Sequence, residues 1–93
     1  MRLSASEIKT IKAAIHQSDP KADIYLFGSR ADPQKKGGDI DLLVFSQILG
    51  TKDKIVILNR IFEKIEEQKI DILIAKDVQE PFVQLVLEKA IKL

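Results

Sequence analysis

The sequence contains no cysteine and no tryptophan among its 93 residues. Without cysteine, disulfides and Cys-based zinc sites are excluded, and a reducing compartment suits the chain. Apolar residues make up 45% and charged residues 31% of the sequence, which is an ordinary globular composition and not that of a disordered chain. The length suits one domain and is too short for two, so we expect a single domain over residues 1–93.

The sequence also lacks an excess of one charge and any long apolar run. Fifteen basic and fourteen acidic residues leave a net charge of +1, so the bulk charge predicts no nucleic-acid partner. Apolar stretches such as 42–45 and 72–75 fall far short of the ~20 residues that a membrane span needs. The first residues, Met1 to Ser4, lack the apolar region of a secretory signal. We therefore expect a cytoplasmic protein without a membrane partner.

The order of elements follows from apolar periodicity and from helix and turn signals. Ser4 and Glu7 have capping-box spacing, and Thr51 is a plausible N-cap for a second helix. Asp77 and Glu80 could cap a third helix, with Pro81 in its first turn. We expect helices from Ser4 to about Ser18, from Thr51 to about Gln68 and from Asp77 to about Ile91. We expect strands over 23–27, 39–45 and 70–75. A loop over 30–38 should open with a helical turn. The predicted class is α/β (α+β), with the order α-β-β-α-β-α around a sheet that is covered by helices.

Three carboxylates occupy unusual positions in apolar strands. Asp39 and Asp41 are two residues apart, so both side chains point to the same side of a strand, ~6.6 Å apart along the chain. Asp71 lies in another apolar strand between Ile70 and Ile72, and three carboxylates converge if the two strands are neighbours. Like charges repel and are costly to desolvate, so a cation between them would stabilise them. Carboxylate oxygens suit Mg²⁺, and two such ions would serve an in-line displacement.

A short turn precedes these acids. Gly28, Ser29 and Arg30 directly follow the first strand. Glycine lets the backbone approach a ligand closely, the serine hydroxyl is a donor, and a guanidinium pairs well with phosphate. The turn therefore predicts a phosphate site, although it also has a simpler interpretation as a chain reversal. Similarly, Asp39 or Asp71 alone would pass for a turn or strand-end residue.

Taken together, these motifs resemble the signature of the DNA polymerase β-like nucleotidyltransferase superfamily. The signature is an apolar residue, Gly-Ser, a spacer of about ten residues, and Asp-apolar-Asp, and residues 26–31 and 39–44 match it. Asp71 matches the third acid, on a later strand. The short chain is similar to the minimal, MntA-like antitoxin type, which consists of the catalytic domain alone.

The resemblance implies a fold, an activity and a set of roles. The fold is a small mixed sheet of three or more strands, with helices mainly on one face. The activity is Mg²⁺-dependent transfer of a nucleoside monophosphate, AMP from ATP in the simplest case, onto an acceptor hydroxyl. Asp39 and Asp41 would bind two metal ions, and Asp71 would bind the catalytic ion and help deprotonate the acceptor. Gly28 and Ser29, with Arg30 beside them, would hold the triphosphate.

Partners enter through the same resemblance. Minimal members often act as antitoxins on a partner with a helical HEPN domain, and some transfer AMP to a tyrosine of that toxin. The last predicted helix is apolar over more than one packing face, so part of it could be covered by a partner or a second copy, or all of it by the rest of the chain. A second hypothesis is a non-catalytic module of the same fold that neutralises a partner by masking it.

Overall fold

The first helix begins with the capping box that the sequence predicts. In the computed structural model, which describes residues 2–34 and 38–93, α1 spans Ala5–His16. The backbone N–H of Glu7 donates to Ser4 Oγ over 3.1 Å, and the N–H of Ser4 donates to Glu7 Oε1 over 2.9 Å. These two bonds satisfy donors that a helix start leaves without partners.

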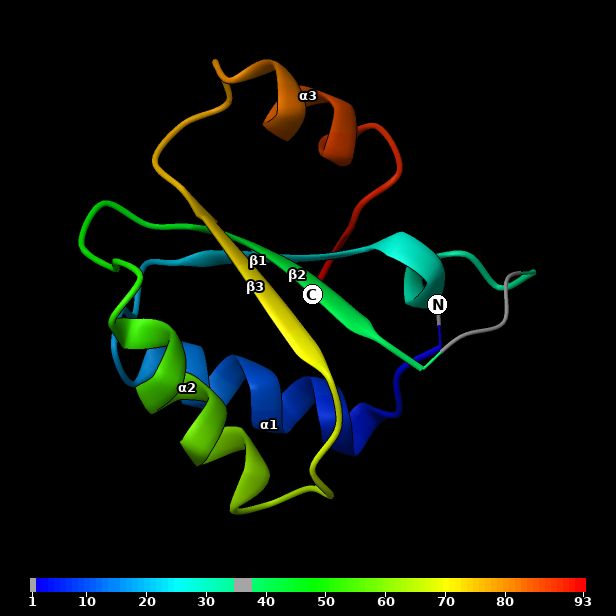
Figure 1. Ribbon diagram of the computed structural model, residues 1–93, viewed down its shortest axis with the longest axis vertical. Coiled ribbons are helices and arrows are strands. Elements are labelled where there is room, and N and C mark those ends of the chain that lie inside the picture. The colour runs from blue at the N-terminus through cyan, green and yellow to red at the C-terminus, as the bar shows by residue number, and fades with distance from the viewer. Residues whose placement is uncertain (1, 35–37) are drawn as a thin grey trace.

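Four strands form one mixed sheet (Figure 1). They are β1 (Asp23–Phe27), β2 (Ile40–Phe45), β3 (Ile70–Ala75) and β4 (Ile91–Lys92), in the spatial order β3-β2-β1-β4. β2 pairs with β1 and β1 with β4 in antiparallel fashion, whereas β2 and β3 run parallel. The parallel pair meets the condition under which the acids of the two strands converge.

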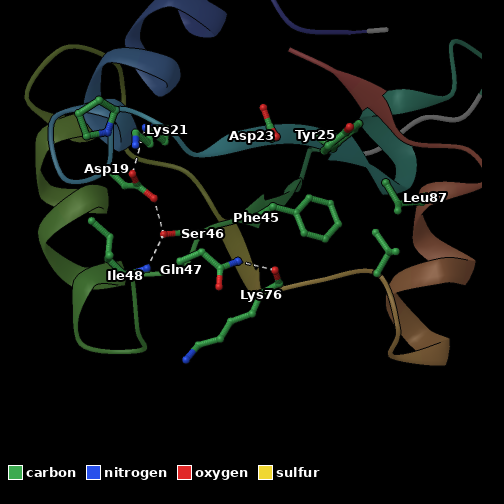
Figure 2. Close-up of a pocket in the computed structure, with 12 residues that line it drawn as sticks. Asp19, Lys21, Asp23, Tyr25, Phe45, Ser46, Gln47, Ile48, Lys76 and Leu87 are labelled. Atoms are coloured by element: carbon green, nitrogen blue, oxygen red, sulfur yellow. Dashed lines mark hydrogen bonds between the residues drawn. The ribbon is translucent and has the colours of Figure 1, made fainter.

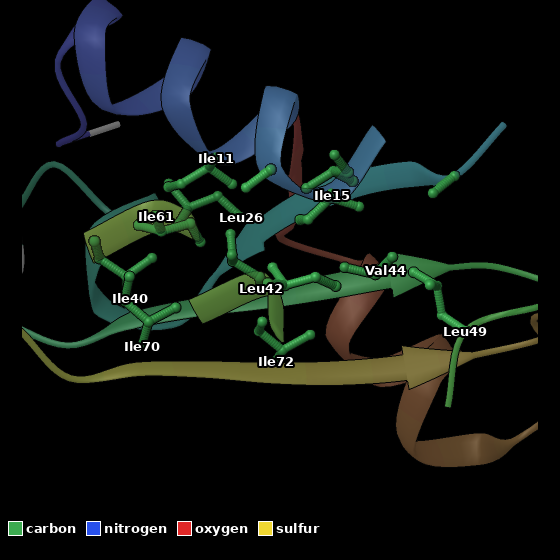
Figure 3. Packing of buried hydrophobic residues seen from close by; sticks show 14 of the residues in the cluster. Ile11, Ile15, Leu26, Ile40, Leu42, Val44, Leu49, Ile61, Ile70 and Ile72 are labelled. Carbon is green, nitrogen blue, oxygen red and sulfur yellow. The ribbon is translucent and has the colours of Figure 1, made fainter. Parts of the chain in front are cut away.

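Helices cover the two faces of this sheet unequally. α1 and α2 (Asp53–Phe62) lie together on one face, and α3 (Pro81–Leu87) lies on the other (Figure 1). The core between the sheet and the two longer helices is built mainly from isoleucine and leucine, as Figure 3 shows. Its fully buried members include Ile11, Ile15, Ile24, Leu26, Ile40, Leu42, Val44, Ile57 and Ile61. The fold class and the one-sided preference of the helices are as predicted.

The opposite face of the sheet carries the acids as well as a smaller core. Leu43, Ala75 and Val83 are buried there, beneath α3. Because side chains alternate along a strand, Asp41 shares this face with Leu43, and Asp71 shares it with Ala75. The short α3 covers only part of the face, so the acid end of β2 and β3 lies beyond its core contacts.

The helix ends differ from the sequence-based expectations. α2 begins at Asp53 rather than near Thr51, because the Asp53 carboxylate accepts the N–H of Gly50 and closes a turn before the helix. It ends at Phe62 rather than near Gln68. Ile65, which the periodicity placed in the helix, still packs against the core from the following turn. Apolar spacing therefore identified residues that face the core, but it did not locate the end of the helix.

The prediction that the third helix continues to Ile91 is wrong. α3 stops at Leu87, and Ile91 with Lys92 forms β4, opposite Leu26 and Tyr25 of β1. Without β4, β1 would be an edge with free backbone groups, and pairing satisfies part of it. Lys92 Nζ also lies 3.4 Å from Asp23 Oδ1. Pairing with a strand distant in the sequence decided the conformation of this segment.

No helix in the described ranges is both long enough and apolar enough to cross a membrane. The helical turn expected at the start of the loop over 30–38 is the 3-10 helix η1 (Gly28–Ala31), which begins two residues earlier. Residues 35–37 of that loop, which include Lys35 and Lys36, lie outside the described residues.

Candidate active site

The parallel pairing of β2 and β3 places two of the predicted acids side by side. Asp41 and Asp71 are direct register partners. Asp39 stands one residue before β2, at the point where the N–H of Ile40 donates to the carbonyl of Lys69 over 3.1 Å. The structure therefore brings all three predicted acids to one end of one strand pair.

Lys69 joins two of these acids. Its ammonium nitrogen lies 3.6 Å from Asp39 Oδ2 and 4.0 Å from Asp71 Oδ2. Asp39 and Asp71 thus lie on the same side of the sheet, as alternation along the strands requires. No motif in the sequence indicated Lys69, although a lysine two residues before Asp71 along a strand shares its face. These side chains are more than half exposed, so the ion pairs contribute little to stability.

Asp41 has a different environment from the other two acids. Partial burial raises the pKa of its carboxyl group, and the neighbouring charges of Asp71 and Asp39 raise it further, whereas the charge of Lys69 lowers it. Burial and like charge both disfavour the ionised form of a carboxyl group, whereas a nearby opposite charge favours it. Asp41 is therefore the acid for which a bound cation would relieve the largest electrostatic cost.

The three carboxylates fit a hard divalent cation by the chemistry of their donor atoms. Carboxylate oxygens are the ligands that Mg²⁺ prefers, and like charges on adjacent strands call for a positive charge among them. In the structure, that charge is the ammonium group of Lys69. In the ranges 2–34 and 38–93, no three His, Cys, Asp or Glu side chains are grouped closely enough to hold an ion as they stand.

Gly28 lies directly against this group of acids. Its φ is +74°, in the left-handed region that L side chains rarely adopt. A Cβ atom at Gly28 would collide with Asp41 Oδ2 and would lie 3.2 Å from Asp41 Cγ. Glycine is thus required twice, by the backbone conformation and by the carboxylate packed on it. The contact joins the predicted phosphate turn to the predicted metal ligands.

Ser29 follows in η1, and its hydroxyl makes no hydrogen bond within the described part of the chain. The turn borders a pocket of about 410 Å³ that is lined by Gly28, Ser29, Ala31, Asp32, Pro33 and Lys89. Lys89 comes from the segment after α3, far away in the sequence. No periodicity or motif pointed to it, because only the tertiary fold brings it to this turn.

Arg30, predicted to bind triphosphate, is engaged with the chain itself. Its guanidinium donates to the carbonyls of Arg2 over 2.8 Å and Gly38 over 3.0 Å, and to Gln68 Oε1 over 3.3 Å. The N–H of Arg2 donates in turn to the carbonyl of Arg30 over 2.8 Å. Arg30 thus ties η1 to three separate segments, and its proposed phosphate contact stays a prediction.

Another pocket lies at the other end of the same sheet face. It has a volume of about 810 Å³, and its walls include the perpendicular rings of Tyr25 and Phe45, with Leu87 beside them (Figure 2). Phe45 is four residues beyond Asp41 on β2, or ~13 Å along a strand. None of the three acids lines this pocket. The chemistry of the acids, rather than the size of a cavity, locates the candidate site.

Comparison with known families agrees with this assignment. The model of the family described as "Polymerase beta, Nucleotidyltransferase" matches residues 9–93, which is nearly the whole chain. The match includes the Gly-Ser turn and all three acids. No curated protein sequence matches the chain.

Proposed function

Because the chain belongs to the polymerase beta nucleotidyltransferase family, we propose that it transfers a nucleoside monophosphate, AMP from ATP in the simplest case, onto an acceptor hydroxyl with the help of Mg²⁺. The observation that carries this proposal is the packing of Asp41 between Asp71 and Gly28. Asp71 is its register partner on β3, and the Cα of Gly28 lies against its carboxylate. Acids and phosphate turn therefore form one continuous site.

The transfer exchanges one bond to phosphorus for another. The acceptor oxygen forms a bond to the α-phosphorus, the bond from that phosphorus to the bridging oxygen breaks, and pyrophosphate leaves. When bound, Mg²⁺ supplies positive charge to the phosphate oxygens, and Asp39, Asp41 and Asp71 would hold it, with two ions as the expected number. Asp71 is exposed, and we assign it as the group that takes the proton of the acceptor hydroxyl.

The chain would hold the substrate mainly through the turn. The Ser29 hydroxyl is free to donate to a phosphate oxygen, and Gly28 lets phosphate approach the backbone closely. Arg30 fixes η1 through its three hydrogen bonds. A turn that is held in place before the substrate arrives loses less entropy on binding.

For the acceptor, we propose a hydroxyl of a partner protein, a tyrosine of a HEPN toxin, with this chain as the antitoxin. The sequence resemblance supports the proposal, and so does the surface of α3. Val83 packs against the sheet, but Phe82 and Leu85 remain 53% and 63% exposed, so residues 2–34 and 38–93 leave part of the apolar surface of this helix uncovered. A partner of this kind, or a second copy of the chain, would bury it.

The same exposed surface favours a second candidate, a module that masks its partner without catalysis. Asp41 distinguishes the two, because masking needs no carboxylate beside Gly28. If Asp41→Ala abolishes neutralisation of the toxin in cells, catalysis is required. If neutralisation persists with the folded variant, the masking module is the correct function.

Calorimetric titration of ATP into the protein with Mg²⁺ tests the nucleotide site directly. The Asp39→Ala, Asp41→Ala double variant is the test protein, and Asp53→Ala is the matched control, because it removes a carboxylate at the start of α2, beyond the opposite end of β2. We expect metal-dependent binding in the wild type and the control, and none in the double variant. Equal binding by all three proteins would refute the proposed site.

A further inference from the structure

The cations around the candidate site differ in what they are already bound to. Lys69 faces Asp39 and Asp71, and the guanidinium of Arg30 donates to carbonyl groups. The ammonium group of Lys89 has neither a hydrogen bond nor an ion pair within residues 2–34 and 38–93. We propose that Lys89 binds the β- and γ-phosphates of the nucleoside triphosphate as a positioning residue. This inference rests on the proposed nucleotidyl transfer.

The position of Lys89 supports this role. It lines the 410 Å³ pocket together with Gly28 and Ser29. Gly28 in turn touches the carboxylate of Asp41. Gly28 is therefore shared by the pocket and by the contact with Asp41, and a chain of phosphates that begins at Asp41 would extend past Ser29 toward Lys89. In Figure 1, the segment after α3 passes on the same side of the sheet as α3, above η1.

Among the residues that the structure describes, the ammonium group of Lys89 has no interaction to break before it binds a phosphate. Lys69 would have to leave two carboxylates before it could reach a phosphate, whereas Lys89 is exposed. Asp32, the other charged residue of the pocket, accepts the N–H of Gln34 over 2.9 Å and does not pair with Lys89. An ammonium group is a compact point charge that binds phosphate well.

The fold explains why this residue lies at the end of α3. The helix is held to the sheet by Val83, and the chain must then return to pair Ile91 and Lys92 with β1. Lys89 lies on this return path, so the pairing of β4 determines its position beside η1. The segment after Leu87, for which the sequence predicted a helix, thus carries Lys89 to the site.

Calorimetric titrations of ATP, ADP and AMP with Mg²⁺ into Lys89→Gln test the proposal. Loss of one charge-assisted contact should weaken ATP binding by about tenfold or more, weaken ADP binding less, and leave AMP binding unchanged. Lys89→Arg should restore most of the affinity for ATP. Lys52→Gln is the matched control, because it removes the ammonium group of another exposed lysine, at the start of α2, and should bind ATP as the wild type does.

The outcomes separate this inference from the proposed function. If the wild type binds ATP and Lys89→Gln binds it equally well, Lys89 is a solvated surface residue and the inference alone is overturned. An equal loss for ATP and AMP would also overturn it, since a disturbed fold does not distinguish the phosphates. If the folded wild type binds no ATP, the proposed function fails and the inference fails with it. Thermal unfolding of each variant checks that the fold is intact.

Discussion

Gly28→Ala tests the contact between the phosphate turn and the acid Asp41. An alanine at φ +74° costs about 1–2 kcal/mol because of its left-handed conformation. The new methyl group also collides with Asp41 Oδ2, so this partly exposed carboxylate must turn away from its position, at a cost of about 0.5–1.5 kcal/mol. The sum, about 2.5 kcal/mol, is a large part of the ~5–14 kcal/mol expected for a domain of this size. It corresponds to a decrease in Tm of about 10–20 °C.

A double-mutant cycle with Asp41→Ala separates the two contributions. Removing the carboxylate removes the two closest contacts of the new methyl group and leaves Asp41 Cβ at an ordinary 3.4 Å. In that background, Gly28→Ala should cost mainly the conformational part, so we expect a coupling free energy of about 0.5–1.5 kcal/mol. The assay is urea unfolding followed by circular dichroism. Gly50→Ala is the control, since nothing lies within 4 Å of its added Cβ and its φ is not positive.

The cycle can refute the reasoning in two ways. A coupling below ~0.5 kcal/mol, within the additivity expected of independent sites, would mean that Asp41 does not pack on Gly28. A Gly28→Ala variant as stable as Gly50→Ala would mean that the turn does not adopt the left-handed conformation. Either result would separate the phosphate turn from the acids and remove the main support for one continuous site.

Three other predictions concern charge, burial and the α3 surface. Asp41→Asn should raise the free energy of unfolding at neutral pH by about 0.5 kcal/mol, because it removes a repulsive cross-strand pair. Since burial and the charges of Asp71 and Asp39 raise the pKa of Asp41, the native state retains its proton longer than the unfolded state. The free energy of unfolding of the wild type therefore falls as the pH rises from the ordinary carboxyl pKa through the raised pKa of Asp41. Thermal unfolding of the metal-free proteins over this pH interval should show a smaller decrease in Tm for Asp41→Asn than for the wild type. Ser46→Ala should lower the free energy of unfolding, measured with urea, by about 1–3 kcal/mol. The reason is that Ser46 Oγ donates to the buried carboxylate of Asp19 and accepts the N–H of Leu49. The control Ser6→Ala, at an exposed position, should be nearly neutral. Phe82→Ser with Leu85→Ser should change Tm little, because both side chains already face water, and a marked decrease would contradict the exposed position of this surface.

The positions of β1, β2 and β3 and of the acids could be predicted from the sequence because each depends on local pattern. Apolar runs end at Gly28 and begin again after Gly38, and acids inside such runs are conspicuous since they oppose burial. The capping box of α1 is equally local, as its two hydrogen bonds join Ser4 and Glu7 only. These features agree between sequence and structure because residues close together in the chain determine them.

Contacts between distant segments lay outside the reach of the sequence. That Asp41 faces Asp71 depends on the parallel register of β2 and β3, and that Gly28 touches Asp41 depends on the antiparallel register of β1 and β2. The segment after Leu87 has an apolar helical pattern, yet pairing with β1 made part of it a strand and brought Lys89 to the phosphate turn. Local sequence motifs therefore identified the residue types of the site. The assembly of these residues depends on strand pairing, which joins distant segments and cannot be read from a local pattern.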